Sequence, residues 1–195
     1  MAAQHPHDAQ PARLANSELA RGDWLLLEQV RYRDAEGRER TWECAQRCED
    51  VEAVCMIPRL IPSNRFLLVS QYRPPADAFV IEFPAGLVDK GESPEEAARR
   101  ELLEETGYHG AIRHVGDPAP TSAGLTGETV RLVRMEIDED DPRNAHPRQR
   151  CDDSEAITVL AGTEEELART LDKARADGAL VDSKVDAFFL ARTHR

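Results

Sequence analysis

Residues 86–108, GLVDKGESPEEAARRELLEETGY, form the most informative segment of this sequence because seven carboxylates fall within it. Ser93, Pro94 and Glu96 supply an N-cap hydroxyl, a proline at the first helical position and the glutamate that completes a capping box. Gly107 is a suitable C-terminal stop for the helix. The segment therefore predicts a helix that begins at about Pro94 and ends just before Gly107.

Three glutamates of this predicted helix lie on one side of it. At about 100° per residue, Glu101, Glu104 and Glu105 share an arc of roughly 100°, which borders the apolar stripe of Ala98 and Leu102. Carboxylates crowded at this margin raise one another's pKa unless a cation neutralises them. Clustered oxygen ligands of this kind suit Mg²⁺ or Mn²⁺. The alternative interpretation is a solvated acidic helix face.

The composition limits the classes of partner. The 195 residues include 25 Lys and Arg against 37 Asp and Glu, which gives a formal net charge of −12. An acidic surface does not favour nonspecific binding to nucleic acid or to anionic membranes. No segment is apolar for long enough to act as a secretory signal or a membrane span, so we expect a cytoplasmic protein. In that compartment the four cysteines are expected to be reduced thiols.

Apolar and alternating runs elsewhere predict strands, so the class is α/β or α+β. Residues 24–32 and 38–47 flank a turn-forming segment and predict a β-hairpin. Further extended runs occupy residues 51–60, 65–73, 78–85, 129–137 and 155–161. Thr163 begins a second capped helix that ends at Gly178.

The spacing of seven residues in segment 86–108 matches the Nudix box. These residues are Gly86, Glu92, Arg100, Glu101, Glu104, Glu105 and Gly107. The chain therefore resembles a Nudix hydrolase. Together with the box, the preceding QYRPPADAFVIEFPAG, residues 71–86, looks like the ADP-ribose/ADP-sugar pyrophosphatase branch of that family.

The resemblance covers roughly residues 20–192 and implies an α/β fold, namely a Nudix α/β/α sandwich with a small N-terminal antiparallel β-sheet. On this basis we expect a disordered tail over residues 1–15, a small β-sheet dimerisation region over residues 16–52 and the Nudix hydrolase domain over residues 53–195. In the similar branch the small sheet is exchanged or packed across a dimer, so a homodimer is implied.

The resemblance also implies an activity, the hydrolysis of ADP-ribose or a related ADP-sugar to AMP and a sugar phosphate with Mg²⁺ or Mn²⁺ as the cofactor. Glu101 and Glu105 are then the expected principal metal ligands, with Glu104 and the carbonyl of Ala85 assisting. Arg100 lies beside Glu104 on the helix and is expected to orient the carboxylates, so both residues are assigned to the catalytic group.

A long polar loop, residues 138–154, precedes the last predicted strand, and loops of this length inside a compact domain are usually functional or disordered. In the similar branch a glutamate on a mobile loop downstream of the box acts as the base, and Glu155 matches that position. Asp152 and Asp153 are neighbours that could replace it. The alternative is that Glu155 is an ordinary acid at the start of a strand.

Substrate residues are also implied by the resemblance. Trp24 and Trp42 match the tryptophans that sandwich adenine in the similar branch, and aromatic faces suit base stacking. Glu43 and Arg47 match residues that contact the nucleotide, and Arg73 matches a phosphate-binding arginine. The alternative is that the two tryptophans only pack the hairpin.

Three further positions bear on the substrate. Glu82 matches a glutamate near the metal site, although a strand residue satisfied by hydrogen bonds is an alternative. Gly86 is expected to shape the loop beside the site. Ala123 stands where ADP-ribose hydrolases usually carry a proline, so another ADP-sugar or GDP-mannose remains an alternative substrate. A nucleotide-binding Nudix protein without turnover is the third hypothesis, although such proteins usually lack box glutamates.

Overall fold

The computed structural model describes residues 10–49, 51–151 and 156–192. The chain divides into two compact units. The smaller unit combines Met1–Glu52 with Ala119–Thr129, and the larger unit combines Ala53–Pro118 with Val130–Arg195. No helix within the described ranges is both long enough and apolar enough to cross a membrane.

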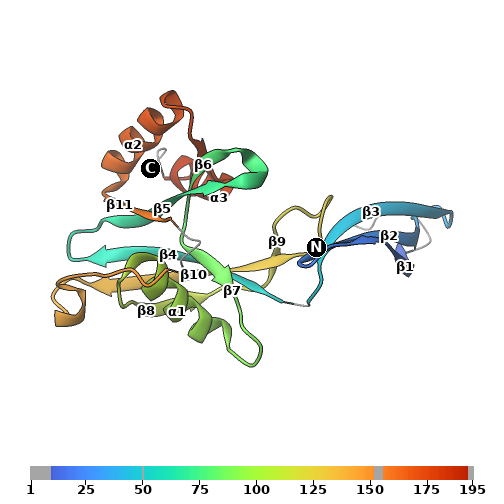
Figure 1. Cartoon of the computed structure of the whole chain (residues 1–195), viewed down its shortest axis with the longest axis horizontal. Helices are drawn as coiled ribbons and strands as arrows, with labels where there is room; N and C mark the ends of the chain where they lie inside the picture. Colours follow the sequence, from blue (N-terminus) through green and yellow to red (C-terminus); the bar gives the residue numbers. More distant parts are fainter. Residues whose placement is uncertain (1–9, 50, 152–155, 193–195) are drawn as a thin grey trace, which may run out of the picture. The chain divides into compact units, whose positions relative to one another are not determined.

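The smaller unit contains a three-stranded antiparallel sheet in the order β1-β2-β3 (Figure 1). Its strands are β1 (Ala12–Arg21), β2 (Leu25–Arg33) and β3 (Glu39–Arg47). The predicted hairpin is therefore confirmed, and Gly37 closes its turn with a φ of 81°. A glycine suits this position because φ is positive there.

Strand β1 begins at Ala12, so the expectation of a disordered tail is wrong for residues 12–15. The sequence gives little warning of this strand, since nearly all of its side chains are exposed and no alternating apolar pattern marks it. Backbone pairing with β2, from Ala12 opposite Arg33 to Arg21 opposite Leu26, holds β1 in place. Residues 1–9 of the expected tail lie outside the described residues.

The smaller unit also includes a segment from the middle of the chain, with β9 (Ala119–Pro120) and the loop after it. The backbone N–H of Ala45 donates to the carbonyl of Leu125 at 2.9 Å. The indole N–H of Trp42 donates to the carbonyl of Gly124 at 3.0 Å. These bonds explain why residues 119–129 group with the N-terminal sheet, although the sequence-based boundaries place them in the segment 53–195.

The larger unit is built on a mixed sheet whose central order is β12-β6-β5-β4-β10-β8, with β7 paired to β4 and β11 paired to β5 (Figure 1). The strands are β4 (Ala53–Ile61), β5 (Phe66–Arg73), β6 (Ala78–Glu82), β7 (Ala85–Leu87), β8 (Ala111–Val115), β10 (Thr129–Asp138), β11 (Thr158–Gly162) and β12 (Leu180–Val181). Strands β4 and β10 pair in parallel, as do β6 and β12, and the other pairs are antiparallel.

Helices cover both faces of this sheet. They are α1 (Pro94–Thr106), α2 (Glu164–Ala176) and α3 (Ser183–Leu190), with two short 3-10 helices at Pro74–Ala76 and Pro142–Asn144. On β4, Val54 and Met56 pack in one core cluster with Leu102 of α1. Cys55 lies in a second cluster with Phe189 of α3 and residues of α2. Because neighbouring strand residues point to opposite faces, this alternation confirms the α/β/α sandwich.

The predicted ends of α1 are confirmed. The Ser93 hydroxyl accepts a hydrogen bond from the N–H of Glu96, and the Glu96 side chain accepts one from the N–H of Ser93. Gly107 ends the helix in the left-handed conformation with φ of 78°. The capping box of α2, on Thr163, is confirmed as well.

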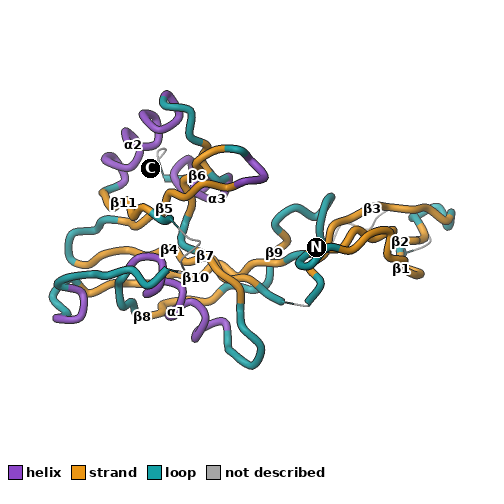
Figure 2. Tube along the Cα trace, viewed as in Figure 1, coloured by secondary structure: helices purple, strands orange, loops and turns teal. Residues whose placement is uncertain are grey.

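The described part of the long polar loop is tied to the end of α1. The side-chain amide of Gln149 donates to the carbonyl of Glu105 at 2.6 Å, and the N–H of Arg150 donates to the carbonyl of Glu104 at 2.8 Å. Figure 2 shows this segment as loop apart from one short helix. The loop therefore satisfies carbonyls that the last turn of a helix leaves without partners.

Candidate active site

The acidic side of α1 lies against the short strand β7. The N–H of Ala85 donates to Oε2 of Glu105 at 3.1 Å. At Gly86, an added Cβ would lie 1.9 Å from the carboxylate carbon of Glu101, so any side chain there would displace that carboxylate. Glycine is required at position 86 because the Glu101 carboxylate fills the space that a side chain would need. The structure thus brings Ala85, Gly86, Glu101 and Glu105 together.

The burial of the three glutamates follows the helical arc predicted from the sequence. The side chain of Glu104 is 38% exposed and that of Glu101 is 15% exposed. Glu105, which adjoins the apolar stripe, is only 4% exposed as a residue. A solvated acidic face would expose all three carboxylates equally. The unequal exposure favours the other interpretation, in which the acidic arc borders the buried side of the helix.

Arg100 connects these carboxylates to the loop that precedes α1. Its Nε and one terminal nitrogen donate to Glu92 at 3.0 and 2.9 Å. The other terminal nitrogen donates to Glu101 at 2.8 Å and to Glu104 at 3.1 Å, and the carbonyl of Leu87 accepts a further bond at 2.9 Å. These bonds use all five N–H groups of a guanidinium. Arg100 therefore orients carboxylates and has no N–H left for a substrate.

This pairing changes the pKa of both partners. Hydrogen bonds from Arg100 hold the pKa of Glu92 below its ordinary range. Hydrogen bonds to Glu92 raise the pKa of Arg100 most, and the hydrogen bond to Glu101 raises it further. The guanidinium charge also offsets part of the repulsion within the acidic cluster, since it lies within hydrogen-bond distance of Glu92, Glu101 and Glu104.

The oxygen atoms of this cluster fit a hard divalent cation by their chemistry. The carboxylate of Glu105 accepts a hydrogen bond from Ala85, and the carboxylate of Glu101 lies against Gly86, so the two acids reach neighbouring residues of β7. Magnesium and calcium favour such oxygen ligands. Within residues 10–49, 51–151 and 156–192, however, no three His, Cys, Asp or Glu side chains are already gathered closely enough to hold a metal.

Arg73 and Glu82 lie on neighbouring strands, β5 and β6, and form an ion pair with a Nε to Oε1 distance of 2.8 Å. The Arg73 side chain is 43% exposed, whereas that of Glu82 is 13% exposed. The guanidinium of Arg73 is therefore partly exposed to solvent, and Glu82 fixes its orientation. Glu82 is satisfied by this hydrogen bond, as one of the two interpretations of the sequence expected.

The four predicted nucleotide contacts in the hairpin all lie in the smaller unit. Trp24 and Trp42 are 82% and 51% exposed, so neither is packed into a core. Glu43 is also exposed, on the same strand as Trp42. Arg47 donates from Nε to Glu128 at 2.6 Å. Glu128 is a partner that the sequence did not reveal, because it lies in the segment that joins this unit from the middle of the chain.

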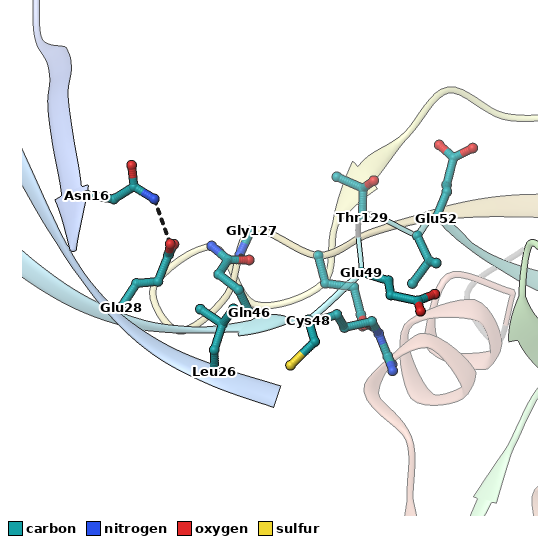
Figure 3. Close-up of a pocket in the computed structure, with 12 residues that line it drawn as sticks. Asn16, Leu26, Glu28, Gln46, Cys48, Glu49, Glu52, Gly127 and Thr129 are labelled. Carbon is teal, nitrogen blue, oxygen red and sulfur yellow. Dashed lines mark hydrogen bonds and ion pairs between the residues drawn. The ribbon is translucent and has the colours of Figure 1, made fainter. Parts of the chain in front are cut away.

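Two pockets open on the smaller unit. One, of about 680 Å³, is lined by Arg47 and by four glutamates, so it suits groups that donate hydrogen bonds, such as amines or hydroxyls. In Figure 3 the amide of Asn16 donates to Glu28 on its wall, at 2.6 Å. The other, of about 530 Å³, is lined by Trp42 and by Ala123, the residue that departs from the usual proline.

The predicted base, Glu155, and its possible substitutes Asp152 and Asp153 lie outside the described residues. The structure therefore leaves this assignment as a prediction. Cys151, the last residue described before this segment, donates from Sγ to the carbonyl of Glu104 at 3.4 Å.

Comparison with known proteins identifies the class to which this fold and this acidic helix belong. Residues 51–180 match the NUDIX domain, and the chain belongs to the Nudix family of hydrolases. It is 36% identical over 184 residues to an ADP-sugar pyrophosphatase of Mus musculus, across 90% of this chain and 84% of that protein. It is 32% identical over 170 residues to an ADP-ribose pyrophosphatase of Saccharomyces cerevisiae, across 83% and 74% of the two chains.

The fold is also similar to that of a solved protein. A crystal structure of an ADP compounds hydrolase, 23% identical in sequence, aligns with a TM-score of 0.68 over 95% of this chain and 94% of its own. The family and the fold predicted from the sequence are therefore confirmed.

Proposed function

We propose that this protein hydrolyses the pyrophosphate bond of ADP-ribose or a related ADP-sugar and releases AMP and a sugar phosphate, with Mg²⁺ or Mn²⁺ as cofactor. The observation that carries the proposal is the buried carboxylate of Glu105 held by the N–H of Ala85, next to the Glu101 carboxylate that occupies the space above Gly86. The names of the mouse and yeast relatives support the substrate class.

The metal ligands in this proposal are Glu101, Glu105, Glu104 and the carbonyl of Ala85. When bound, a divalent cation offsets the negative charge of a diphosphate and makes a water molecule easier to deprotonate. The protein keeps the carboxylates in place, because Arg100 fixes Glu101 and Glu104 through hydrogen bonds. Arg100 is in this sense a positioning residue.

Other residues bind the substrate or move a proton. Arg73 attracts a phosphate group with its exposed charge, and Glu82 orients the Arg73 guanidinium. Glu155 removes a proton from the attacking water, with Asp152 or Asp153 as the alternative base. Positioning and electrostatic stabilisation of this kind supply most of the catalysis in phosphoryl transfer.

In this proposal the nucleotide is recognised by the smaller unit. Trp24 and Trp42 stack on adenine, which their exposed rings allow, and Glu43 and Arg47 contact the nucleotide. The protein is a homodimer in this proposal, with the small sheet as the dimerisation region. The exposed large apolar side chains of this unit support an interface there: Leu19, Trp24, Leu25, Leu27, Trp42 and Leu125. The cytoplasmic location stays a prediction from the sequence.

A substrate panel tests the activity. The purified protein is incubated with Mg²⁺ or Mn²⁺ and with ADP-ribose, ADP-glucose, GDP-mannose, NADH, diadenosine polyphosphates or 8-oxo-dGTP, and released phosphomonoester is measured. We expect ADP-ribose to be hydrolysed best. Preference for GDP-mannose would contradict the adenine assignment of the tryptophans, and no turnover of any compound would favour a nucleotide-binding protein without catalysis.

A further inference from the structure

A third pocket, of about 330 Å³, lies in the larger unit. Its wall includes four arginines, one each from β4, β8 and β10 and one beyond α3, and two phenylalanines: Arg59, Arg113, Arg134, Arg192, Phe66 and Phe188. The protein carries a net charge of −12, so four guanidinium groups around one small pocket are a local reversal of charge. Clusters of one sign in a concave surface concentrate ions of the opposite sign.

This pocket is on the opposite face of the sheet from α1. Ile57 and Arg59 of β4 both line it, and they alternate with Met56 and Leu60, which pack in the core cluster of α1. Ile57 and Phe188 instead belong to the cluster that includes α2 and α3. The pocket is therefore separate from the acidic cluster of Glu101 and its neighbours.

Two of the four arginines already have carboxylate partners. Arg113 donates to Glu136 at 2.7 Å, and Arg192 donates to Glu164 at 2.6 Å. Arg192 also lies over the rings of Phe66 and Phe188, at 5.3 and 5.0 Å from their centroids. These contacts hold Arg192 against the aromatic wall of the pocket.

The other two arginines have no carboxylate partner among the described residues. Arg59 donates from Nε to the amide oxygen of Asn64, which is uncharged. The side chain of Arg134 is exposed and forms no hydrogen bond or ion pair with any residue that the structure describes. Ile57 is in register with Arg134 on the parallel neighbour β10, so Arg59 and Arg134 reach the same side of the sheet. Glu136, the one carboxylate that the described residues contribute to the pocket wall, is in register with Arg59 and already accepts a hydrogen bond from Arg113, so the four arginines leave the wall with an excess of positive charge.

We propose that this pocket binds a small phosphomonoester, with its phosphate held by Arg59 and Arg134 and its organic part against Phe66 and Phe188. Planar guanidinium groups match the oxygen atoms of a phosphate and bind them in pairs. The pocket volume of about 330 Å³ is at the lower end of the range for small-molecule sites, which favours one phosphorylated sugar over a larger polyanion. The proposal does not depend on the activity proposed above.

The test is a titration of the full-length protein in EDTA, so that no divalent cation can bring phosphate to the acidic helix. The probe is ribose 5-phosphate, followed by calorimetry and by backbone amide NMR shifts, and inorganic phosphate is a second probe. We expect saturable binding of both, with shifts concentrated in β4, β8, β10 and α3. Shifts concentrated in β7 and α1 would overturn the proposal.

Variants of the two arginines supply the matched comparison. Arg134→Gln and, separately, Arg59→Gln should weaken binding of ribose 5-phosphate by about tenfold or more, since each removes a charged hydrogen-bond donor. Arg169→Gln is the control, because this exposed arginine on α2 is not part of the pocket wall and its loss changes net charge equally. Equal affinity in all three variants and the wild type, or binding of a poly-glutamate peptide but of neither phosphate probe, would refute the proposal.

Discussion

At the scale of single residues, the position of Glu105 links the stability of the larger unit to its proposed chemistry. This carboxylate is 4% exposed and accepts a hydrogen bond from Ala85. A buried carboxylate is costly unless hydrogen bonds or a cation compensate its charge. An amide or an apolar residue would fill the same space without this cost, so the burial of a carboxylate at position 105 points to a functional role.

We expect Glu105→Gln to lower turnover of the best substrate by roughly two orders of magnitude or more, because the amide cannot supply the negative charge that a divalent cation needs. Circular dichroism and thermal unfolding should show that the fold persists. Glu165→Gln, an exposed glutamate in the first turn of α2, is the control and should keep wild-type kcat. Unchanged turnover in Glu105→Gln would remove this residue from the proposed metal ligands.

The ion pair of Glu92 with Arg100 predicts a dependence of stability on pH. Hydrogen bonds from Arg100 keep the pKa of Glu92 in the folded protein below its ordinary value of 4.5. A carboxyl group with a lowered pKa in the folded state stabilises it above the unfolded pKa, and this contribution disappears as the pH falls through the folded pKa. The free energy of unfolding of the wild type should therefore exceed that of Glu92→Gln most clearly at neutral pH.

Urea unfolding of the two proteins at a series of pH values measures this difference. We expect about 1–3 kcal/mol at pH 7, typical of charged hydrogen bonds, and a progressive loss of the difference below about pH 4.5. A difference that stays constant down to the acid range would show that Glu92 acts through its shape alone.

At this scale the sequence predicted that the three acids share one side of the helix, next to the apolar stripe, because this follows from helical geometry. It did not predict that Leu87 and Glu92 share Arg100, nor that Glu128 pairs with Arg47. Those contacts depend on how loops return to a helix or a sheet, and no local spacing encodes them. The fixed positions of the Nudix box specify which residues belong to the acidic cluster but not which of their atoms are in contact.

At the scale of elements, α1 shows how a helix end depends on its neighbour. Gly107 and Gly91 both have positive φ, 78° and 88°, on either side of this helix. An added Cβ at Gly107 would lie 2.3 Å from the backbone nitrogen of Arg148, whereas an added Cβ at Gly91 meets nothing within 4 Å. A substitution at Gly91 therefore introduces backbone strain alone, whereas one at Gly107 introduces backbone strain and a steric clash.

We expect Gly91→Ala to lower the free energy of unfolding by about 1 kcal/mol, the usual cost of a left-handed non-glycine residue. Gly107→Ala should cost roughly 1–3 kcal/mol more, because the loop at residues 147–148 must move. Chemical denaturation of both variants measures the two values. Equal losses would mean that this loop adapts without resistance.

The elements whose bounds the sequence predicts best are those with capping or turn residues at their ends. The capping boxes of α1 and α2 gave their first residues, and the strands β2, β3 and β5 had apolar or turn patterns. Strand β1 had none of these, since its side chains are exposed and only its backbone pairs. Edge strands of this kind are specified by their neighbour and not by their own sequence.

At the scale of the whole molecule, the exposed apolar side chains of the smaller unit predict self-association. Leu27 is 39% exposed on β2, and its replacement by aspartate places a charge in the proposed interface. In sedimentation experiments we expect the wild type at twice the chain mass of 21.8 kDa and Leu27→Asp at a mass nearer to one chain. Leu180→Asp, at an exposed leucine of the larger unit, is the control and should remain a dimer. A monomeric wild type would contradict the dimer proposal.

The smaller unit is assembled from two stretches that are far apart along the chain, and this affects how the protein is made. Trp42 and its hydrogen-bond acceptor Gly124 are separated by 82 residues. At a ribosomal rate of roughly 5–20 residues per second, Gly124 is synthesised on the order of 4–16 s after Trp42, so the hairpin is made well before the segment that completes the smaller unit. A shortened protein that contains only the first fifty residues would lack the segment 119–129. A shortened protein that begins after residue 50 would contain this segment but would lack β3, to which it binds.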